Sequence, residues 1–240
     1  MEAKSKEKFV HSVFESIAPK YDFMNDLLSF RRHKAWRKFT MKKMGVQQGQ
    51  SAADICCGTC DWTIDLALAS RDGEIAGLDF SENMLEIGKR KLAEKNLDGQ
   101  VKLVQGNAME LPFADNSFDF ATIGFGLRNV PDIKQVLLEM KRIVKPGGKV
   151  VCLELSQPLS QPWKGMYFLY FRHLLPLLGK WIAKSYEQYR WLPESLASFP
   201  DYKELARIFE QDIGLQQVEA YPLTGGIAAL HIGVKGAHQS

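Results

Sequence analysis

Short apolar runs alternate along this chain with longer segments in which hydrophobic residues recur at helical spacing. The apolar runs end at residue 54 and occupy 74–79, 101–105, 118–124, 149–155, 215–221 and 227–234. Helical spacing is found in 8–44, 62–69, 131–144 and 202–211, and in the segment that follows Ser81, a predicted N-cap. Strands that alternate with helices predict an α/β fold with a doubly wound, mostly parallel, seven-stranded sheet. Ligands of such sheets bind at the carboxyl ends of the strands.

The first apolar run leads into S-A-A-D-I-C-C-G-T-C-D-W, residues 51–62. Gly58 is predicted to adopt a backbone conformation that side chains disfavour, so that the N–H groups of residues 58–60 approach a ligand closely. Asp79 ends the second run, at the spacing where a carboxylate reaches ribose hydroxyls. Together these features predict a nucleoside-bearing cofactor. A dinucleotide-binding fingerprint needs more glycines than this loop has. The alternative to a cofactor loop is an ordinary strand-to-helix turn.

The composition is typical of a soluble globular protein, with 45% hydrophobic and 25% charged residues among 240. The net charge of +3 gives no overall field of the kind that marks nucleic-acid-binding proteins. The charged N-terminus lacks the apolar core of a signal peptide, and the four cysteines make a poor disulfide framework. A cytoplasmic location is therefore expected.

We expect a single domain over 1–240. It comprises a basic helical flap (1–45), a cofactor-binding core (46–156), a helical insertion after the fifth strand (157–196), and a C-terminal helix and strand pair (197–240). The insertion is aromatic and basic together, which suits a cover over an apolar pocket or a membrane interface. Its charged residues and Pro176 argue against a membrane-spanning helix, and plain packing on the core is the alternative.

The core resembles class I S-adenosylmethionine-dependent methyltransferases in its loop D-I-C-C-G-T-C-D, in Asp79 and in the segments G-N-A-M and L-P-F-A-D-N-S-F-D. Two longer stretches, Y-D-F-M-N-D-L-L-S-F-R-R-H-K-A-W and R-I-V-K-P-G-G-K-V-V-C-L-E-L-S, resemble the signature motifs of the menaquinone and ubiquinone biosynthesis C-methyltransferases. The resemblance extends from about residue 8 to 235, and the Cys-Cys-Gly-Thr form of the loop is closer to the demethylmenaquinone branch. Cys60 stands where relatives usually have Gly or Ala.

The resemblance implies transfer of a methyl group from S-adenosylmethionine to a ring carbon of a prenylated hydroquinone, with demethylmenaquinol as the expected acceptor and menaquinone biosynthesis as the pathway. In-line displacement discharges the cofactor's positive charge, so no metal is demanded, and alignment supplies much of the rate. The implied partners are the prenylated quinol and, at its periphery, the inner face of the membrane, with no nucleic acid. A homodimer is left open.

The resemblance also implies the cofactor-binding residues. Asp79 is expected at the ribose hydroxyls, Asn107 and the Ala108 backbone at the adenine edge, and Gly58 with Thr59 along the methionine portion; Asp54 either holds the loop or reaches the methionine ammonium through water. Alternatively, Asp79 caps a helix or is solvated, and Asn107 is a turn residue.

On the acceptor side, the segment G-F-G-L-R-N-V and the flap supply the expected catalytic residues Arg128, Asn129, Tyr21, Asp22 and His33. Arg128 is permanently charged, which suits it to holding a phenolate or a bridging water. His33 titrates in the useful range. The alternatives are a salt bridge for Arg128 and a structural role for His33.

Other functions remain as alternatives at this point. A methyltransferase for another lipid or phenolic acceptor, including ubiquinone precursors, shares the cofactor loops. A nicotinamide-dependent oxidoreductase needs a fuller glycine pattern, and a membrane-surface module leaves those loops unexplained. A redox or metal role for Cys57 and Cys60 is less favoured than their interpretation as small apolar residues in a tight loop.

Overall fold

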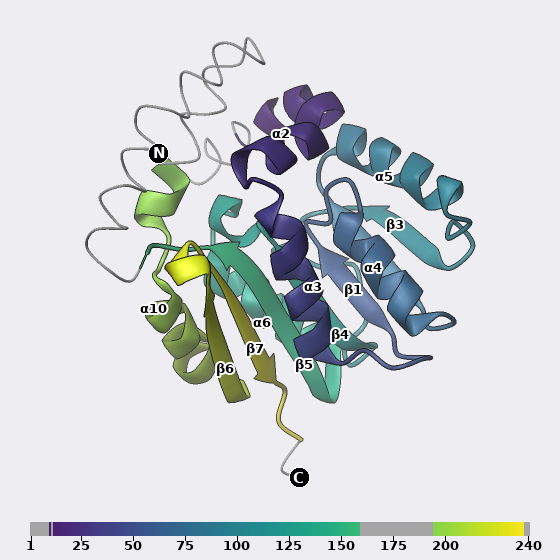
Figure 1. The fold of residues 1–240 in the computed structure, drawn as a ribbon. Helices are drawn as coiled ribbons and strands as arrows, with labels where there is room; N and C mark the ends of the chain where they lie inside the picture. Colours follow the sequence, from purple (N-terminus) through teal and green to yellow (C-terminus); the bar gives the residue numbers. More distant parts are fainter. Residues whose placement is uncertain (1–9, 11, 159–193, 238–240) are drawn as a thin grey trace.

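The computed structural model describes residue 10 and residues 12–158 and 194–237. Within this part of the chain a seven-stranded sheet has the order β3-β2-β1-β4-β5-β7-β6 (Figure 1). The strands are β1 (Ala52–Ile55), β2 (Ile75–Asp79), β3 (Val101–Gln105), β4 (Phe118–Gly124), β5 (Val144–Leu155), β6 (Gln216–Leu223) and β7 (Ala228–Val234).

Strands β1 to β5 pair in parallel, and β7 runs antiparallel to both of its neighbours, β5 and β6. The chain order reverses between β1 and β4, so the carboxyl ends of these two strands flank the switch point where ligands of doubly wound sheets bind. The segment K-P-G-G, residues 145–148, lies inside β5, where the pairing with β4 shifts register and Gly147 has a φ of +79°. The mostly parallel sheet predicted from the sequence is confirmed.

Helices cover both faces of the sheet (Figure 1). One face carries α3 (Arg32–Met44), α4 (Asp61–Ser70) and α5 (Glu82–Glu94), whose buried residues pack with Ala52, Ile75 and Val151. The other face carries α6 (Ile133–Ile143), α10 (Tyr202–Arg207) and the π-helical turn η4 (Ile208–Asp212), packed on residues such as Ala53 and Ile123. Apolar layers therefore cover both faces of the sheet. This leaves the carboxyl ends of the strands as the place for a ligand site.

Local sequence explains where the helices begin. The Ser81 hydroxyl accepts a hydrogen bond from the Met84 N–H at 3.2 Å, which confirms the predicted N-cap of α5. Asp132 caps α6 and Asp201 caps α10 in the same way, each accepting from two backbone N–H groups. The helix predicted over 202–211 ends earlier as an α-helix, because its last turn widens into η4.

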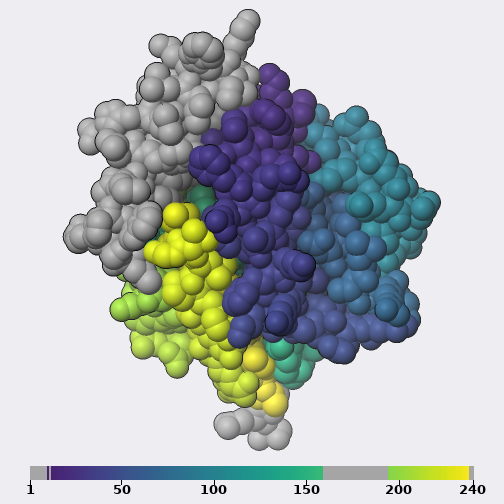
Figure 2. All heavy atoms as spheres, viewed as in Figure 1, coloured from purple at the N-terminus to yellow at the C-terminus, as the bar shows by residue number. Residues whose placement is uncertain are grey.

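The N-terminal arm, defined here as residues 12–44, begins at the carboxyl end of the sheet and continues as α3 over one of its faces (Figure 1). It contains the 3₁₀ turn η1 (Ala18–Lys20), α2 (Tyr21–Leu28) and α3. In the space-filling view the arm lies over the core as the purple band (Figure 2). Most of the predicted insertion, 157–196, lies outside the described residues. Within the described ranges, no helix combines the length and the apolar character that a membrane crossing requires.

Candidate cofactor and acceptor site

Two cavities lie at the carboxyl ends of the central strands. The larger, here called the apolar cavity, has a volume of about 740 Å³ including the space open to solvent, and the smaller, here called the polar cavity, about 560 Å³. Apolar side chains from the arm, β2 and the loop after β4 line the first, and charged and polar side chains line the second. The two share Tyr21, Cys56, Gly58, Gly124 and Phe125, so they adjoin. The arrangement fits one elongated ligand with an apolar end and a charged end.

Asp79 lies at the end of β2 in the wall of the apolar cavity. Its side-chain oxygens accept hydrogen bonds from the Gly58 N–H at 2.8 Å and the Ser81 N–H at 3.0 Å. Burial raises its pKa to about 6 despite these donors. Each carboxylate oxygen has a second lone pair, so the fixed carboxylate retains the capacity to accept from ligand hydroxyls.

Asp54, near the end of β1, has a different set of partners. It accepts hydrogen bonds from the hydroxyls of Thr63 at 2.7 Å and Thr122 at 2.8 Å, which tie it to α4 and β4. Burial raises its pKa to about 6 as well. It lines the polar cavity, and of its two expected roles these bonds favour holding the loop.

The loop between β1 and α4 has three residues in left-handed backbone conformations: Cys56 (φ +55°), Gly58 (φ +54°) and Cys60 (φ +65°). The prediction for Gly58 is confirmed. The expectation that the N–H groups of residues 58–60 all face a ligand is wrong, because the Gly58 N–H bonds Asp79 and the Cys60 N–H bonds the Cys57 carbonyl. The N–H groups of Gly58 and Cys60 therefore bond within the protein and not to a ligand.

The buried Cys60 side chain has room because Gly88 lies opposite it on α5, where an added Cβ would overlap the Cys60 sulfur. The sulfurs of Cys57 and Cys60 lie 3.9 Å apart, and all four cysteines are free thiols. The side-chain hydrogen bond with Cys60, followed by burial, raises the pKa of the Cys57 thiol well above its usual value. No group of three or more metal-ligating side chains occurs within the described ranges.

Asn107 and Ala108 line the apolar cavity beside Asp79, on the loop that follows β3. The Asn107 side-chain oxygen accepts a hydrogen bond from the Met109 N–H at 2.9 Å, which is the geometry of a turn residue. Within the described residues the Asn107 side-chain nitrogen makes no hydrogen bond, so the turn leaves it available as a donor to the cavity. Phe14 and Phe80 lie edge to face at 6.3 Å along the same cavity.

Arg128 follows β4 in the 3₁₀ turn η2 (Leu127–Asn129) and pairs with Glu154 of β5. Its Nη1 lies 2.5 Å from Glu154 Oε1 and 2.6 Å from the Phe125 carbonyl. Glu154 is 1% exposed, and the Arg128 Nε is buried without a hydrogen-bond partner in the described part of the chain. The salt bridge considered as the alternative role of Arg128 is therefore present. The next residue, Asn129, lines the apolar cavity.

The arm brings Tyr21, Asp22 and His33 to the polar cavity. Burial raises the pKa of Tyr21, and burial together with nearby Arg37 lowers the pKa of His33, which is therefore neutral at neutral pH. His33 Nδ1 lies 2.7 Å from the Ser29 hydroxyl. Asp22 accepts from the Thr59 hydroxyl at 2.6 Å and from Lys91 at 3.0 Å.

Comparison with known proteins decides the family. A model of the ubiE/COQ5 methyltransferase family matches residues 2–235. The chain belongs to the ubiE/COQ5 methyltransferase family. The demethylmenaquinone methyltransferase of Halalkalibacterium halodurans is 59% identical over 98% of this chain and 96% of its own length. That of Bacillus cytotoxicus is 59% identical over 97% of this chain and 98% of its own.

The solved structures agree on the fold of this ubiE/COQ5 family member. A SAM-dependent methyltransferase from Aquifex aeolicus superposes with a TM-score of 0.60 at 17% identity, covering 82% of this chain and 88% of its own. The family expected from the signature motifs is confirmed, and the chain is a methyltransferase. The alternative of a nicotinamide-dependent oxidoreductase is wrong.

Several cavity residues of this ubiE/COQ5 family member were missed by sequence reasoning. Gly124 ends β4 and lines both cavities, and a Cβ there would come within 2.8 Å of the Trp62 ring. Its position as the first residue of the expected acceptor segment G-F-G-L-R-N-V was a usable signal. Arg37 and Asp61 line the polar cavity, but charges on amphipathic helices usually face solvent, so the pattern did not separate them from ordinary surface residues.

Proposed function

We propose that the protein transfers the methyl group of S-adenosylmethionine to a ring carbon of a prenylated hydroquinone, with demethylmenaquinol as acceptor and menaquinol as product. The observation that carries the proposal is the similarity, over nearly the whole chain, to relatives named demethylmenaquinone methyltransferase. The adjoining apolar and polar cavities support it, because they match a ligand with a nucleoside at one end and a charged amino acid at the other.

The cofactor, when bound, supplies a methyl group on a positively charged sulfur. Asp79 is proposed to accept hydrogen bonds from the ribose hydroxyls, with Asn107 and Ala108 at the adenine. Gly58 and Thr59 are proposed to line the methionine portion, and Asp54 to hold their loop through its two threonine partners. With this set, the reactive sulfur is proposed to lie near the wall shared by the two cavities, which includes Tyr21 and Phe125.

On the acceptor side, ring methylation requires electron density that an ionised ring hydroxyl provides. Arg128 is proposed to stabilise that negative charge, directly or through water, with Glu154 fixing its guanidinium. Asn129 is proposed to donate to a ring oxygen. Tyr21, Asp22 and His33 are proposed to bound the reaction site from the arm, and His33, neutral at neutral pH, retains the ability to accept a proton.

The direct test follows transfer of labelled methyl from S-adenosylmethionine to reduced demethylmenaquinone, with a reduced ubiquinone precursor in a parallel assay. Label in the naphthoquinol product alone is expected. Preferential labelling of the ubiquinone precursor, or of neither quinol, would overturn the proposed acceptor.

Arg128 needs a paired design, because removing it alone leaves the buried Glu154 carboxylate unpaired, which costs about 3–5 kcal/mol. We therefore compare Glu154→Gln with the double variant Arg128→Met/Glu154→Gln. The double variant should lower the methyl-transfer rate well below that of Glu154→Gln, with little change in affinity for S-adenosylhomocysteine. Equal rates in the two variants would remove Arg128 from the acceptor site.

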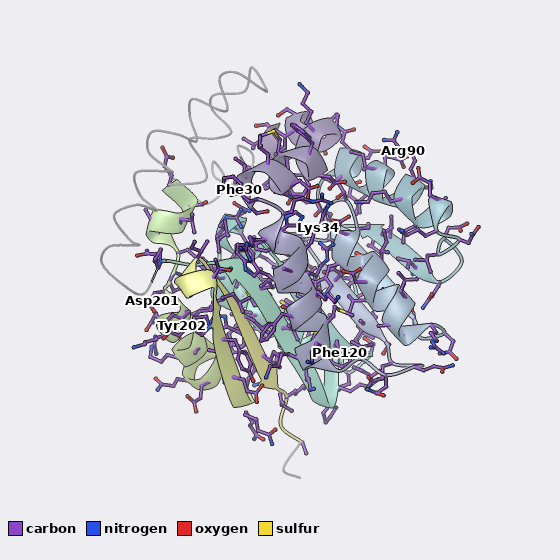
Figure 3. All side chains as sticks on the ribbon, viewed as in Figure 1. Phe30, Lys34, Arg90, Phe120, Asp201 and Tyr202 are labelled. Atoms are coloured by element: carbon purple, nitrogen blue, oxygen red, sulfur yellow. The ribbon has the colours of Figure 1, made fainter. Side chains whose placement is uncertain are left out.

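The proposed acceptor carries an apolar isoprenoid tail, which partitions into a bilayer, and the arm offers a surface suited to a membrane. Phe23 is 59% exposed and Phe30 73% exposed, beside the exposed cations Arg31, Arg32 and Lys34. Phe30 and Lys34 lie where α2 passes into α3 (Figure 3). Aromatic and basic side chains together favour an anionic membrane surface, so we propose that the protein is cytoplasmic and contacts the membrane peripherally through this end of the arm.

Sedimentation with anionic liposomes tests that contact. The double variant Phe23→Ser/Phe30→Ser should reduce the bound fraction several-fold, whereas the control Leu68→Ser, which removes a 55% exposed leucine from α4, should not. Equal binding of the two variants would place the contact elsewhere.

Light scattering on the purified protein separately tests the predicted alternative of a homodimer.

A further inference from the structure

We infer that Arg37, on the arm helix α3, binds the carboxylate of the methionine end of the cofactor. The inference rests on the proposed use of S-adenosylmethionine, but not on the identity of the acceptor. With the ribose at Asp79, the amino acid end has one continuous path, past Gly58 and the shared wall into the polar cavity. That end carries both an ammonium and a carboxylate at neutral pH, so the polar cavity must satisfy both charges.

Arg37 is the permanently charged cation among the described residues that line the polar cavity. The other basic lining residue, His33, is neutral because burial and the nearby Arg37 charge lower its pKa. Three acids, Asp22, Asp54 and Asp61, line the same wall. A single cation among several acids is the charge pattern expected of a wall that must hold both ends of a zwitterion.

The geometry of Arg37 leaves donors for a ligand. Its Nε donates to Asp65 Oδ2 at 2.6 Å, and its Nη2 lies 3.3 Å from Asp61 Oδ2. Those two acids hold the guanidinium in place, with 14% of the side chain exposed. A guanidinium has five N–H donors in a fixed planar arrangement, and within the described residues Nη1 makes no hydrogen bond.

Asp61 is already paired with two cations, so its negative charge does not exclude a ligand carboxylate from the Arg37 guanidinium. Burial alone would raise its pKa, but its ion pairs with Lys91 and Arg37 lower it overall, so it stays ionised. Lys91 also pairs with Asp22. The cluster therefore fixes Arg37 on the arm relative to the loop of Gly58 and Thr59, and a bound carboxylate would add a further link between arm and core.

The test compares two ligands that differ only at the amino acid end. S-adenosylhomocysteine carries the carboxylate and ammonium, and 5′-methylthioadenosine keeps the adenosine and sulfur without them. Calorimetric titration of wild type, Arg37→Met and the control Lys38→Met, an exposed lysine on the same helix, separates local from general charge effects. Arg37→Met should weaken S-adenosylhomocysteine binding at least tenfold and 5′-methylthioadenosine binding less than twofold, and Lys38→Met should change neither.

The outcomes distinguish the inference from the proposal on which it rests. Equal losses for both ligands, or no loss, would overturn the role of Arg37 while leaving the cofactor assignment standing. Failure of wild type to bind S-adenosylhomocysteine would overturn the cofactor assignment itself. Retained 5′-methylthioadenosine binding reports a folded variant. Should Arg37→Met not fold, the decarboxylated analogue of S-adenosylhomocysteine must bind wild type at least tenfold more weakly than the parent, and equal affinities would refute the inference.

Discussion

Asp54 and Asp79 end neighbouring parallel strands, and burial raises the pKa of each to about 6, yet their partners differ. Asp54 is held by two threonine hydroxyls on other elements. Asp79 is held by two backbone N–H groups of the loops that form the cavity wall. Equal burial and equal pKa thus accompany different tasks: Asp54 braces the loop, and Asp79 presents a carboxylate to the apolar cavity. A perturbed pKa marks the site but does not assign the role.

The largest expected effect comes from Asp79→Ala. Loss of a charge-assisted pair of hydrogen bonds to the ribose should weaken S-adenosylhomocysteine binding by about 1.5–3 kcal/mol. Calorimetry measures this directly. An unchanged affinity would remove Asp79 from the cofactor site and with it the contrast between the two acids.

Thr122→Val probes the bracing acid by removing one of the two donors to Asp54. We expect it to lower the free energy of unfolding by about 1–2 kcal/mol at pH 7. The folded-state pKa of about 6 exceeds the ordinary value near 4, so the stability tied to the protonated form is complete below about pH 4 and is lost as the pH rises through about 6.

The Thr122→Val deficit should therefore be smaller at pH 5, where folded Asp54 is mostly protonated, than at pH 7. Urea unfolding at the two pH values measures it, and cofactor affinity serves as the control because it should change little. A deficit that grows on acidification would contradict the bracing role of the ionised carboxylate.

The pH dependence of cofactor binding tests the role of Asp79 in the contrast between Asp54 and Asp79. If the ribose hydroxyls bind the ionised form of Asp79, affinity should fall about tenfold between pH 7 and pH 5, following the ionised fraction of a carboxyl with a pKa of about 6. Asp79→Asn should bind more weakly and flatten this profile. A slope that persists in Asp79→Asn would assign the titration to another group, with Asp54 the first candidate.

The smallest effect is expected at the loop between the two acids. Cys60→Gly relieves a left-handed backbone angle but removes a buried sulfur that fills the space beside Gly88. These contributions oppose each other at roughly 0.5–1 kcal/mol each, so stability should change by less than about 0.5 kcal/mol. A thermal unfolding comparison with Cys60→Ala, which keeps the strained angle and should be less stable, isolates the backbone contribution.

The sequence by itself determined the sheet, its parallel direction, the Ser81 cap and the positions of Asp54, Gly58 and Asp79 at the switch point. These follow from local periodicity and from the rule that parallel strands end together. The family, too, was readable from long motifs with rare residues at fixed spacing, and the homologous sequences confirm it.

Only the tertiary structure decided which charged groups face the cavities. Arg37 and Asp61 lie on separate helices and meet at the polar cavity, and Glu154 of β5 pairs with Arg128 of the turn η2. Similarly, the Gly58 N–H bonds Asp79 across the loop. Such pairings depend on how elements far apart in the chain pack together, and because periodicity reports each element separately, the sequence pattern carries no record of them.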